Sequence, residues 1–312
     1  LESDAGNYDA TEPLQREALA IDRAAYGEEH VKVASGLINL GADLRRKGDY
    51  AAAEPLLREG VVMTRRLLGD DHQDVAYALN QLGRLLVLQG RPAEALPFVR
   101  EGLEIRRAIV GPLHVEVGAS LGNLAGILSD LGDLDGAVDA RRQSLAIMRH
   151  NFGEEHPYTA GTLQSLAYAH HLAGRLDSAR VSYAYAVDLQ RRLLEPADPN
   201  RGFALTGLGR VLVDAGRPAE AEPYLREAVA ERLAGLPEGH WFVAASELAL
   251  GRCLTRLGRY DEAGPLLTRA HEVLRDTFGD DDERTADARE QLATLHRESG
   301  AVTPGLDPGP DR

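Results

Sequence analysis

Apolar and small side chains recur with helical spacing in the stretch from residue 69 to residue 110. A first stripe, at positions i, i+3, i+4 and i+7 of one helix face, consists of Leu79, Leu82, Gly83 and Leu86. After a turn at residues 90–92, a second stripe with helical spacing consists of Ala95, Val99, Gly102 and Leu103. The pattern predicts two helices joined by a short turn, which we call helix A and helix B.

The same pattern returns every 42 residues along the chain. A glycine at the turn recurs without slippage at Gly6, Gly48, Gly90, Gly132, Gly174, Gly216, Gly258 and Gly300. A period in this range indicates stacked helical repeats. We expect a truncated first repeat (helix B) at residues 1–26, six units of 42 residues at 27–278, a C-terminal capping helix at 279–300 and a disordered tail at 301–312.

Further columns of the repeat predict how the helices pack. One alanine per unit follows the turn, at Ala53, Ala95, Ala137, Ala179, Ala221 and Ala263. One leucine per unit belongs to helix A, at Leu40, Leu82, Leu124, Leu166, Leu208, Leu250 and Leu292. A glycine or alanine follows each of these leucines and lets helices approach to about 8 to 10 Å. The turn glycine suits a left-handed end of helix A, and the prolines at 13, 55, 97, 223 and 265 are expected near the first turn of helix B.

These motifs resemble the tetratricopeptide repeat family. The resemblance rests on the sequence N-L-G at residues 39–41, the glycine turn and the D-E-A alanine, and it covers roughly residues 1–300. The 42-residue unit is similar to the longer kinesin-light-chain-like subclass, since the usual unit has about 34 residues. The C-terminal units are similar to arrays that follow the catalytic domain of bacterial serine/threonine kinases. The resemblance implies an all-α fold, a right-handed superhelical solenoid of antiparallel helix pairs.

Charge and cysteine content narrow the classes of partner. The net charge is −14, and only two of the 35 basic residues are lysine, which argues against nucleic acid or an anionic membrane as the main partner. The single cysteine, Cys253, cannot form an intrachain disulfide and fits a reducing, cytoplasmic compartment. The sequence begins inside a repeat, with neither an initiator methionine nor the pattern of a signal peptide, so we expect a fragment of a longer protein.

Three features could indicate chemistry, and each has a structural interpretation. The sequence GASLG at 118–122 matches a nucleophile elbow, but that motif needs a strand-to-helix turn and here lies on the apolar stripe of helix A. The acidic run GDDDE at 279–283 lacks the ligand spacing of a calcium loop and suits the positive end of a helix. We therefore predict no catalytic activity, no cofactor and no metal site.

The third feature is a column of histidines, which consists of His30, His72, His114, His156 and His240. Equivalent atoms of stacked units lie at least about 8 Å apart, so one column cannot enclose a zinc ion. Aspartate replaces histidine at Asp198 and Asp282, and aspartate is a preferred N-cap. The column predicts hydrogen bonding at the start of helix A.

The family resemblance implies a concave wall lined by helix A, on which a partner would bind. The residues expected on this wall are Asn39, Asn80, Arg84, Asn123, Gln164, Tyr168, Arg210, Arg252 and Arg256. Amides can donate and accept toward a peptide backbone, and arginines collected on one wall of an acidic chain favour an acidic segment. The alternative is a solvated helix face. Arg210 has a possible partner in Asp214, whereas Arg252 and Arg256 are like charges at i and i+4.

Two functions of different class follow from these observations. The first is a non-catalytic scaffold that binds an acidic peptide or protein segment on its concave helix A surface. The second is the C-terminal regulatory arm of a larger bacterial signalling enzyme, such as a serine/threonine kinase. A role in self-association, as a homo-oligomer, is the third alternative. The sequence itself carries no kinase motif.

Overall fold

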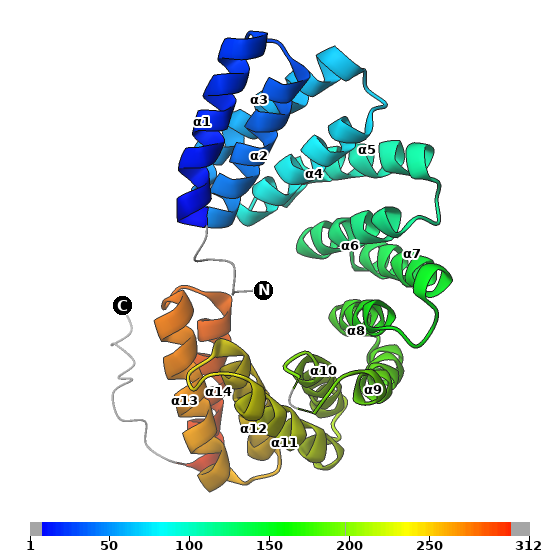
Figure 1. Cartoon of the computed structure of the whole chain (residues 1–312). Coiled ribbons are helices and arrows are strands. Elements are labelled where there is room, and N and C mark those ends of the chain that lie inside the picture. The colour runs from blue at the N-terminus through cyan, green and yellow to red at the C-terminus, as the bar shows by residue number, and fades with distance from the viewer. Residues whose placement is uncertain (1–7, 197, 301–312) are drawn as a thin grey trace, which may run out of the picture. The chain divides into compact units, whose positions relative to one another are not determined.

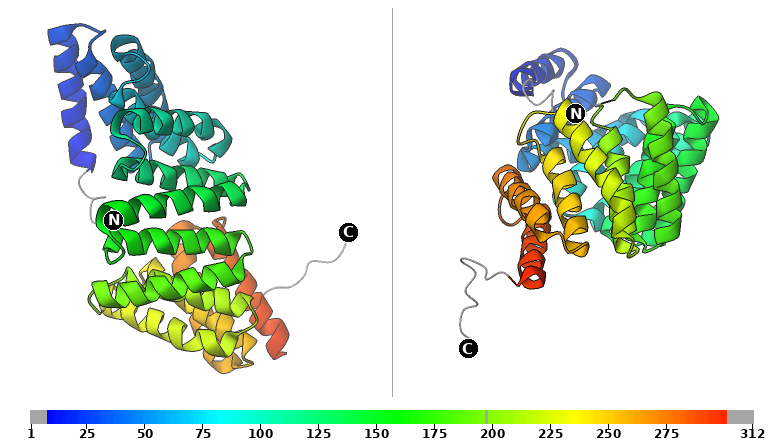
Figure 2. Two further views of the ribbon diagram at one scale, coloured as in Figure 1. Left: turned by 90° about the vertical axis from the view of Figure 1, so that its right-hand side faces the viewer. Right: turned by 90° about the horizontal axis from the view of Figure 1, so that it is seen from below.

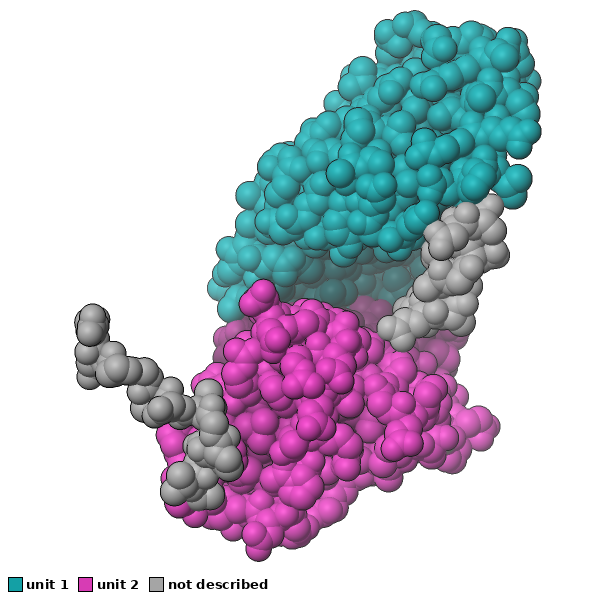
Figure 3. Space-filling model, turned by 90° about the vertical axis from the view of Figure 1, so that its left-hand side faces the viewer, with its two compact units in different colours: residues 1–153 teal, residues 154–312 magenta. Residues whose placement is uncertain are grey.

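The computed structural model describes residues 8–196 and 198–300. Within these ranges the chain folds into fourteen helices and contains no strand. The chain divides into two compact units, Leu1–Gly153 and Glu154–Arg312, which Figure 3 distinguishes by colour. Each unit is described by itself below.

The first unit contains seven helices, and consecutive helices run antiparallel (Figure 1). Helix A of each repeat is α2 (Val31–Lys47), α4 (Gln73–Leu88) or α6 (Val115–Asp130). The B helices are α1 (Tyr8–Tyr26), α3 (Tyr50–Leu68), α5 (Pro92–Val110) and α7 (Leu134–Phe152). Each A helix packs mainly on the B helix that follows it, and α4 also contacts α2 and α3.

The second unit repeats this arrangement, and Figure 2 shows the helix pairs from two further sides. Its A helices are α8 (Pro157–Leu172), α10 (Arg201–Asp214), α12 (Trp241–Arg256) and α14 (Glu283–Ser299). Its B helices are α9 (Leu176–Leu193), α11 (Pro218–Gly235) and α13 (Tyr260–Phe278). The predicted all-α array of antiparallel helix pairs is confirmed.

The repeated columns have the packing roles expected of them. The six alanines after the turn are all at most 1% exposed. The small residue after each leucine is required by close packing, because a Cβ on Gly83 would lie 2.4 Å from Val99 Cγ2. The turn glycines from Gly48 to Gly300 all have positive φ, a region that favours glycine. Leu292 on α14 is only half-buried, so the leucine column loosens at the last helix.

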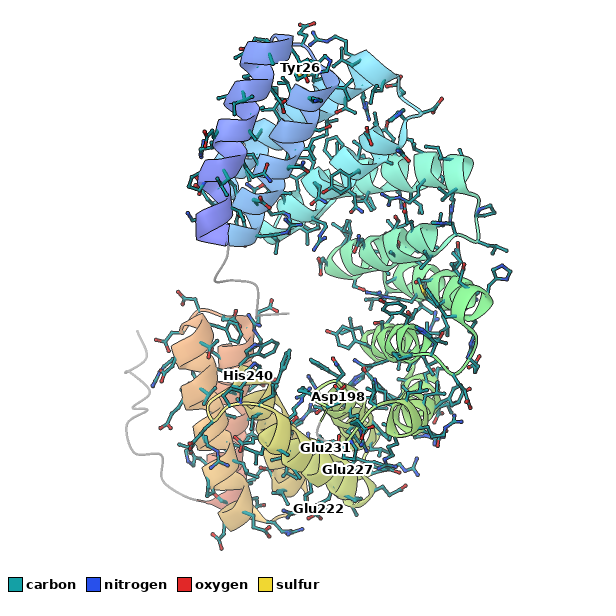
Figure 4. The ribbon with its side chains drawn as sticks, in the orientation of Figure 1. Tyr26, Asp198, Glu222, Glu227, Glu231 and His240 are labelled. Carbon is teal, nitrogen blue, oxygen red and sulfur yellow. The ribbon has the colours of Figure 1, made fainter. Side chains whose placement is uncertain are left out.

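The histidine column caps the A helices, as predicted. Each of the five histidines precedes its helix, and its Nδ1 accepts a hydrogen bond from the backbone N–H two residues later, at 3.1 to 3.3 Å. Asp282 accepts in the same way at the start of α14. Asp198 accepts from the Asn200 N–H at 2.9 Å but lies two positions farther from its helix, in the connection before α10 (Figure 4). These acceptors satisfy N–H groups that have no partner within the helix.

One local expectation was wrong. The prolines of helix B do not lie near its first turn but inside the helix, as Pro55 does at the sixth residue of α3. The helix begins earlier than the proline because Asp49 caps it, accepting from the Ala52 N–H at 3.1 Å. The expected tail at 301–312 lies outside the described residues. No described helix is long and apolar enough to cross a membrane.

Candidate binding groove

A groove of about 340 Å³ opens on the helix A face of the first unit, between α4 and α6. Its apolar surface consists of Val87 and Leu88 from α4, Val99 from α5 and Ile127 from α6. Three arginines from three different helices line it as well: Arg45 of α2, Arg84 of α4 and Arg141 of α7. The groove thus combines an apolar surface with three positive charges in a chain that is acidic as a whole.

Arg45 is buried, and no carboxylate of the described residues pairs with it. The side chain is 5% exposed, its hydrogen bond to Gln81 Oε1 is long at 3.5 Å, and its Nε has no partner. Burial, together with the like charges of Arg84 and Arg46, lowers the pKa of Arg45 to about 10. The guanidinium therefore remains charged at neutral pH, at a cost in free energy that no carboxylate in the described ranges offsets.

Arg84 and Arg141 have no hydrogen bond or ion pair with any residue in the described part of the chain. Burial alone lowers the pKa of the Arg141 guanidinium. Gly122 makes room for this side chain, because a Cβ on that glycine would lie 3.1 Å from Arg141 Nη1. Along the same helix, the space above Gly126 is open to at least 4 Å. Two glycines of α6 therefore keep the groove deep enough for a ligand to reach the arginines.

Other arginines of the same unit are paired with carboxylates. Arg91 lies 2.7 Å from Glu94 and 2.8 Å from Glu54, and Arg58 lies 2.8 Å from Glu54. Among the residues that line the groove, Asp130 is the one acid. The groove therefore offers several guanidinium N–H donors, and a guanidinium can bind a carboxylate through two parallel hydrogen bonds.

The structure brings together three of the four wall residues predicted in the first unit. Arg84 and Asn123 both line the groove. Asn123 Nδ2 donates to Asn80 Oδ1 at 3.2 Å, which links the exposed faces of α6 and α4. Asn39 is exposed on α2 and is not among the groove residues.

In the second unit, the predicted residues are arranged differently. Arg252 is not an unpaired cation, since its Nη2 donates to Asp214 Oδ1 at 2.7 Å. His171 Nε2 lies 2.7 Å from the other oxygen of Asp214. Burial acts to raise the pKa of Asp214, but His171, Arg252 and Arg210 outweigh it and lower that pKa. Arg252 is therefore already neutralised locally, contrary to the expectation from its spacing to Arg256.

The remaining predicted residues of the second unit do not share one groove with Arg252. Arg210 and Arg256 are exposed, and Tyr168 is 53% exposed on α8. Gln164 accepts a hydrogen bond from Gln190 Nε2 at 2.9 Å and lines a separate pocket. The positive groove thus lies in the first unit, not at the arginines of α12.

Sequence reasoning missed Arg141. A signal for Arg141 does exist in the sequence, because the equivalent position of the other 42-residue repeats holds Leu57, Val99, Tyr183, Leu225 and Leu267. Arginine in an otherwise apolar or aromatic column indicates a local change of role. Arg45 has a similar signal, since the equivalent position of the next repeat holds Val87.

An array of antiparallel helix pairs with capped A helices and an open helix A face defines a helical-repeat protein. The profile of the tetratricopeptide repeat family matches residues 1–61, 37–108, 116–190, 166–230 and 242–301. The chain belongs to the tetratricopeptide repeat family. No match to a curated protein was found.

Solved structures share this fold. A structure of BtubC (BKLC) from P. vanneervenii is 20% identical, with 73% of this chain and 91% of that chain covered and a TM-score of 0.62. A putative kinesin light chain from Podosopora anserina, with nearly identical TPR-like repeats, is 25% identical; 66% of this chain and 98% of that chain are covered, with a TM-score of 0.56. PilF of Pseudomonas aeruginosa is 14% identical, with 83% and 97% covered and a TM-score of 0.52. Kinesin-light-chain-like repeats are therefore among the chain's structural relatives.

Proposed function

We propose that the chain is a non-catalytic interaction scaffold that binds an acidic polypeptide segment in the groove of the first unit. Tetratricopeptide repeat proteins generally act as protein-interaction scaffolds. The observation that supports an acidic ligand is the convergence of Arg45, Arg84 and Arg141, none of which pairs with a carboxylate in residues 8–196 or 198–300. A cytoplasmic location fits the free thiol of Cys253.

The physical argument rests on the cost of an uncompensated charge. Arg45 is desolvated in the free protein, so a ligand carboxylate regains Coulomb energy without first having to remove water from that guanidinium. Arg84 and Arg141 can complete the contact from α4 and α7. Apolar side chains of the same segment can cover Val87, Leu88 and Ile127, while Asn80 and Asn123 offer amide groups to its backbone.

The test uses the full chain and a short fluorescent peptide in which glutamate alternates with leucine. A second peptide, with glutamine for each glutamate, has the same length and apolar content. Fluorescence anisotropy should show tighter binding of the glutamate peptide, with a difference that shrinks at higher salt because exposed charges are screened. Arg141→Gln should weaken that binding about 10-fold or more, as expected for a charged hydrogen bond.

The matched control is Arg46→Gln, which removes one positive charge from α2 outside the groove. Arg46 is paired with Asp43 at 2.6 Å, so its loss should change the affinity by less than about 2-fold. Equal binding of both peptides, or equal effects of the two substitutions, would contradict the proposed ligand and its place in the groove.

A further inference from the structure

Two pockets occupy equivalent positions in the two units, 84 residues apart in the repeat. Each lies between the first turns of a helix A, the last turn of the helix B that follows and the start of the next helix A. The pocket of the first unit, around Tyr77 and Arg106, has a volume of about 230 Å³. Its equivalent in the second unit, around Gly161 and Gln190, has about 430 Å³.

One substitution within the repeat accounts for the larger pocket. Gly161 of α8 stands where the first unit has Tyr77, so the phenol ring is missing from the wall. A Cβ on Gly161 would meet nothing within 4 Å, so no neighbouring side chain lies directly against this part of the α8 backbone. The pocket is therefore open directly above the α8 backbone.

A second substitution changes the polar group beside the opening. Arg106 of the first unit donates to Ser120 Oγ and lies 3.2 Å from Glu116. The second unit has Gln190 in place of Arg106. The positions equivalent to its two partners are Ala204 and Asn200. Neither of these two positions therefore offers the hydroxyl or the carboxylate that satisfies the arginine in the first unit.

Gln190 is left with an unused hydrogen-bond acceptor. The side chain is 4% exposed and lines the pocket. Its Nε2 donates to Gln164 Oε1 at 2.9 Å, whereas its Oε1 accepts no hydrogen bond from any residue that the structure describes. A buried acceptor without a donor is costly, and a ligand that supplies the donor removes that cost.

The other lining residues are mostly apolar, and none of the residues that line the pocket is charged. Leu193 and Leu194 come from the end of α9, and Phe203 comes from α10. Tyr158 at the start of α8 is 63% exposed, which is unusual for an aromatic ring beside a pocket. A mostly apolar pocket of 300 to about 1,000 Å³ with a few polar groups is typical of small-molecule sites.

We propose that this pocket binds a small, uncharged aromatic molecule that carries an N–H or O–H donor. The ring occupies the space above Gly161, between Tyr158 and Phe203, and the donor reaches Gln190 Oε1. Aromatic rings favour offset or edge-to-face contacts, which the two flanking rings can provide. The site belongs to the second unit and is independent of the acidic ligand proposed for the first.

The experiment compares indole with benzothiophene, which has the same shape but a sulfur atom in place of the N–H group. Binding to the full chain is measured by NMR titration up to about 5 mM of each probe. Indole should bind with a dissociation constant of about 1 mM or lower, given its few atoms. Benzothiophene should bind about 2- to 10-fold more weakly, because it leaves Gln190 Oε1 without a donor.

Two substitutions taken from the chain's own repeats locate the site. Gly161→Tyr restores the residue of the first unit and should abolish indole binding by occupying the space above the α8 backbone that the indole ring would take. Gln190→Met introduces the residue type that the preceding 42-residue repeat has at this position, Met148. This variant should lose the preference for indole over benzothiophene. Ala119→Tyr is the matched control, since Ala119 is exposed at the equivalent position of the preceding repeat and lines neither this pocket nor the groove of the first unit. It should leave indole binding unchanged.

Several outcomes would overturn the proposal. These are no binding of indole, equal binding of the two probes to the unmodified chain, or full binding by Gly161→Tyr. Circular dichroism and a urea midpoint for each variant exclude a simple loss of folding. If N-acetyltryptophan amide bound at least about 10-fold more tightly than indole, the occupant would be an aromatic side chain of a partner polypeptide instead.

Discussion

Replacing Arg45 with methionine should make the free protein more stable. Methionine keeps the unbranched shape and apolar stem of arginine but has no charge. Arg45 is 5% exposed beside Arg84 and Arg46, and the structure places no carboxylate against it in the described part of the chain. A side chain selected only for stability would not be an unpaired buried cation, since well-packed apolar residues are often more favourable.

The size of the effect follows from the pKa. Lowering of the Arg45 pKa to about 10 means that the folded state disfavours the charged form relative to the unfolded chain. At about 1.4 kcal/mol per pKa unit, the cost is on the order of 3 kcal/mol. The cost is fully present at pH 7 and fades only as the pH rises through about 10. Allowing for solvent at the groove and the long Gln81 contact, we expect a gain of about 1 to 2 kcal/mol.

The assay is urea unfolding followed by circular dichroism at pH 7. A gain of this size should raise the urea midpoint by roughly 0.5 to 1 M, if the slope is near 2 kcal/mol per M. Arg46→Met is the control, because it removes an equal charge from the same helix but breaks an ion pair of 2.6 Å with Asp43. It should leave the midpoint unchanged or lower it slightly.

A double-mutant cycle tests the cause of the gain. Arg84→Met should also stabilise the chain, by less, because it removes one like charge that acts on Arg45. Its effect should shrink when Arg45 is already methionine, which measures the repulsion between the two arginines. If Arg45→Met lowered the midpoint, Arg45 would be a structural residue. The argument for a carboxylate site would then be refuted.

Two further predictions concern the repeat itself. Gly83→Ala should destabilise the chain by up to about 2 kcal/mol in urea unfolding, because the new Cβ would lie 2.4 Å from Val99 Cγ2 and overpacking outweighs the gain in helix propensity. Gly126→Ala meets no atom within 4 Å and should stabilise by about 0.5 to 1 kcal/mol, so equal shifts of the two variants would contradict the packing role. His114→Ala should lower the stability by about 1 kcal/mol, because the Glu116 N–H loses its cap. His114→Asn should retain the stability, since asparagine is a preferred N-cap. An unchanged midpoint for the alanine variant would show that the cap contributes nothing.

Most of the fold could be predicted because each of its rules acts within one repeat. Turn geometry depends on a glycine with positive φ, capping depends on a side chain two residues away, and close packing depends on a small residue in a fixed column. Each of these signals appears several times along the chain. An error in one unit would therefore conflict with the others, and the period makes the assignment robust.

The candidate site could not be predicted in the same way. Whether an arginine on helix A is free depends on which acid a neighbouring repeat brings near it, and that acid is far away in sequence. Arg252 lies 2.7 Å from Asp214, 38 positions earlier, whereas Arg84 has no such partner in the described chain. The i, i+4 rule compares neighbours on one helix and does not include contacts between repeats.

A polar residue in a repeat column that is apolar in other units can be interpreted only when the structure shows whether its polar atoms have hydrogen-bond partners. Arg232 stands in the same column as Gln190 and is 1% exposed, with its pKa lowered to about 10 by burial. Its Nη1 donates to the Phe242 carbonyl at 2.6 Å and to Ser246 Oγ at 2.7 Å, and its guanidinium lies 4.6 Å from the centre of the Phe203 ring. These contacts give Arg232 a role in joining two repeats. Gln190 differs because its acceptor is unused and the adjoining wall lacks a side chain, and this combination distinguishes a binding site from a variation in packing.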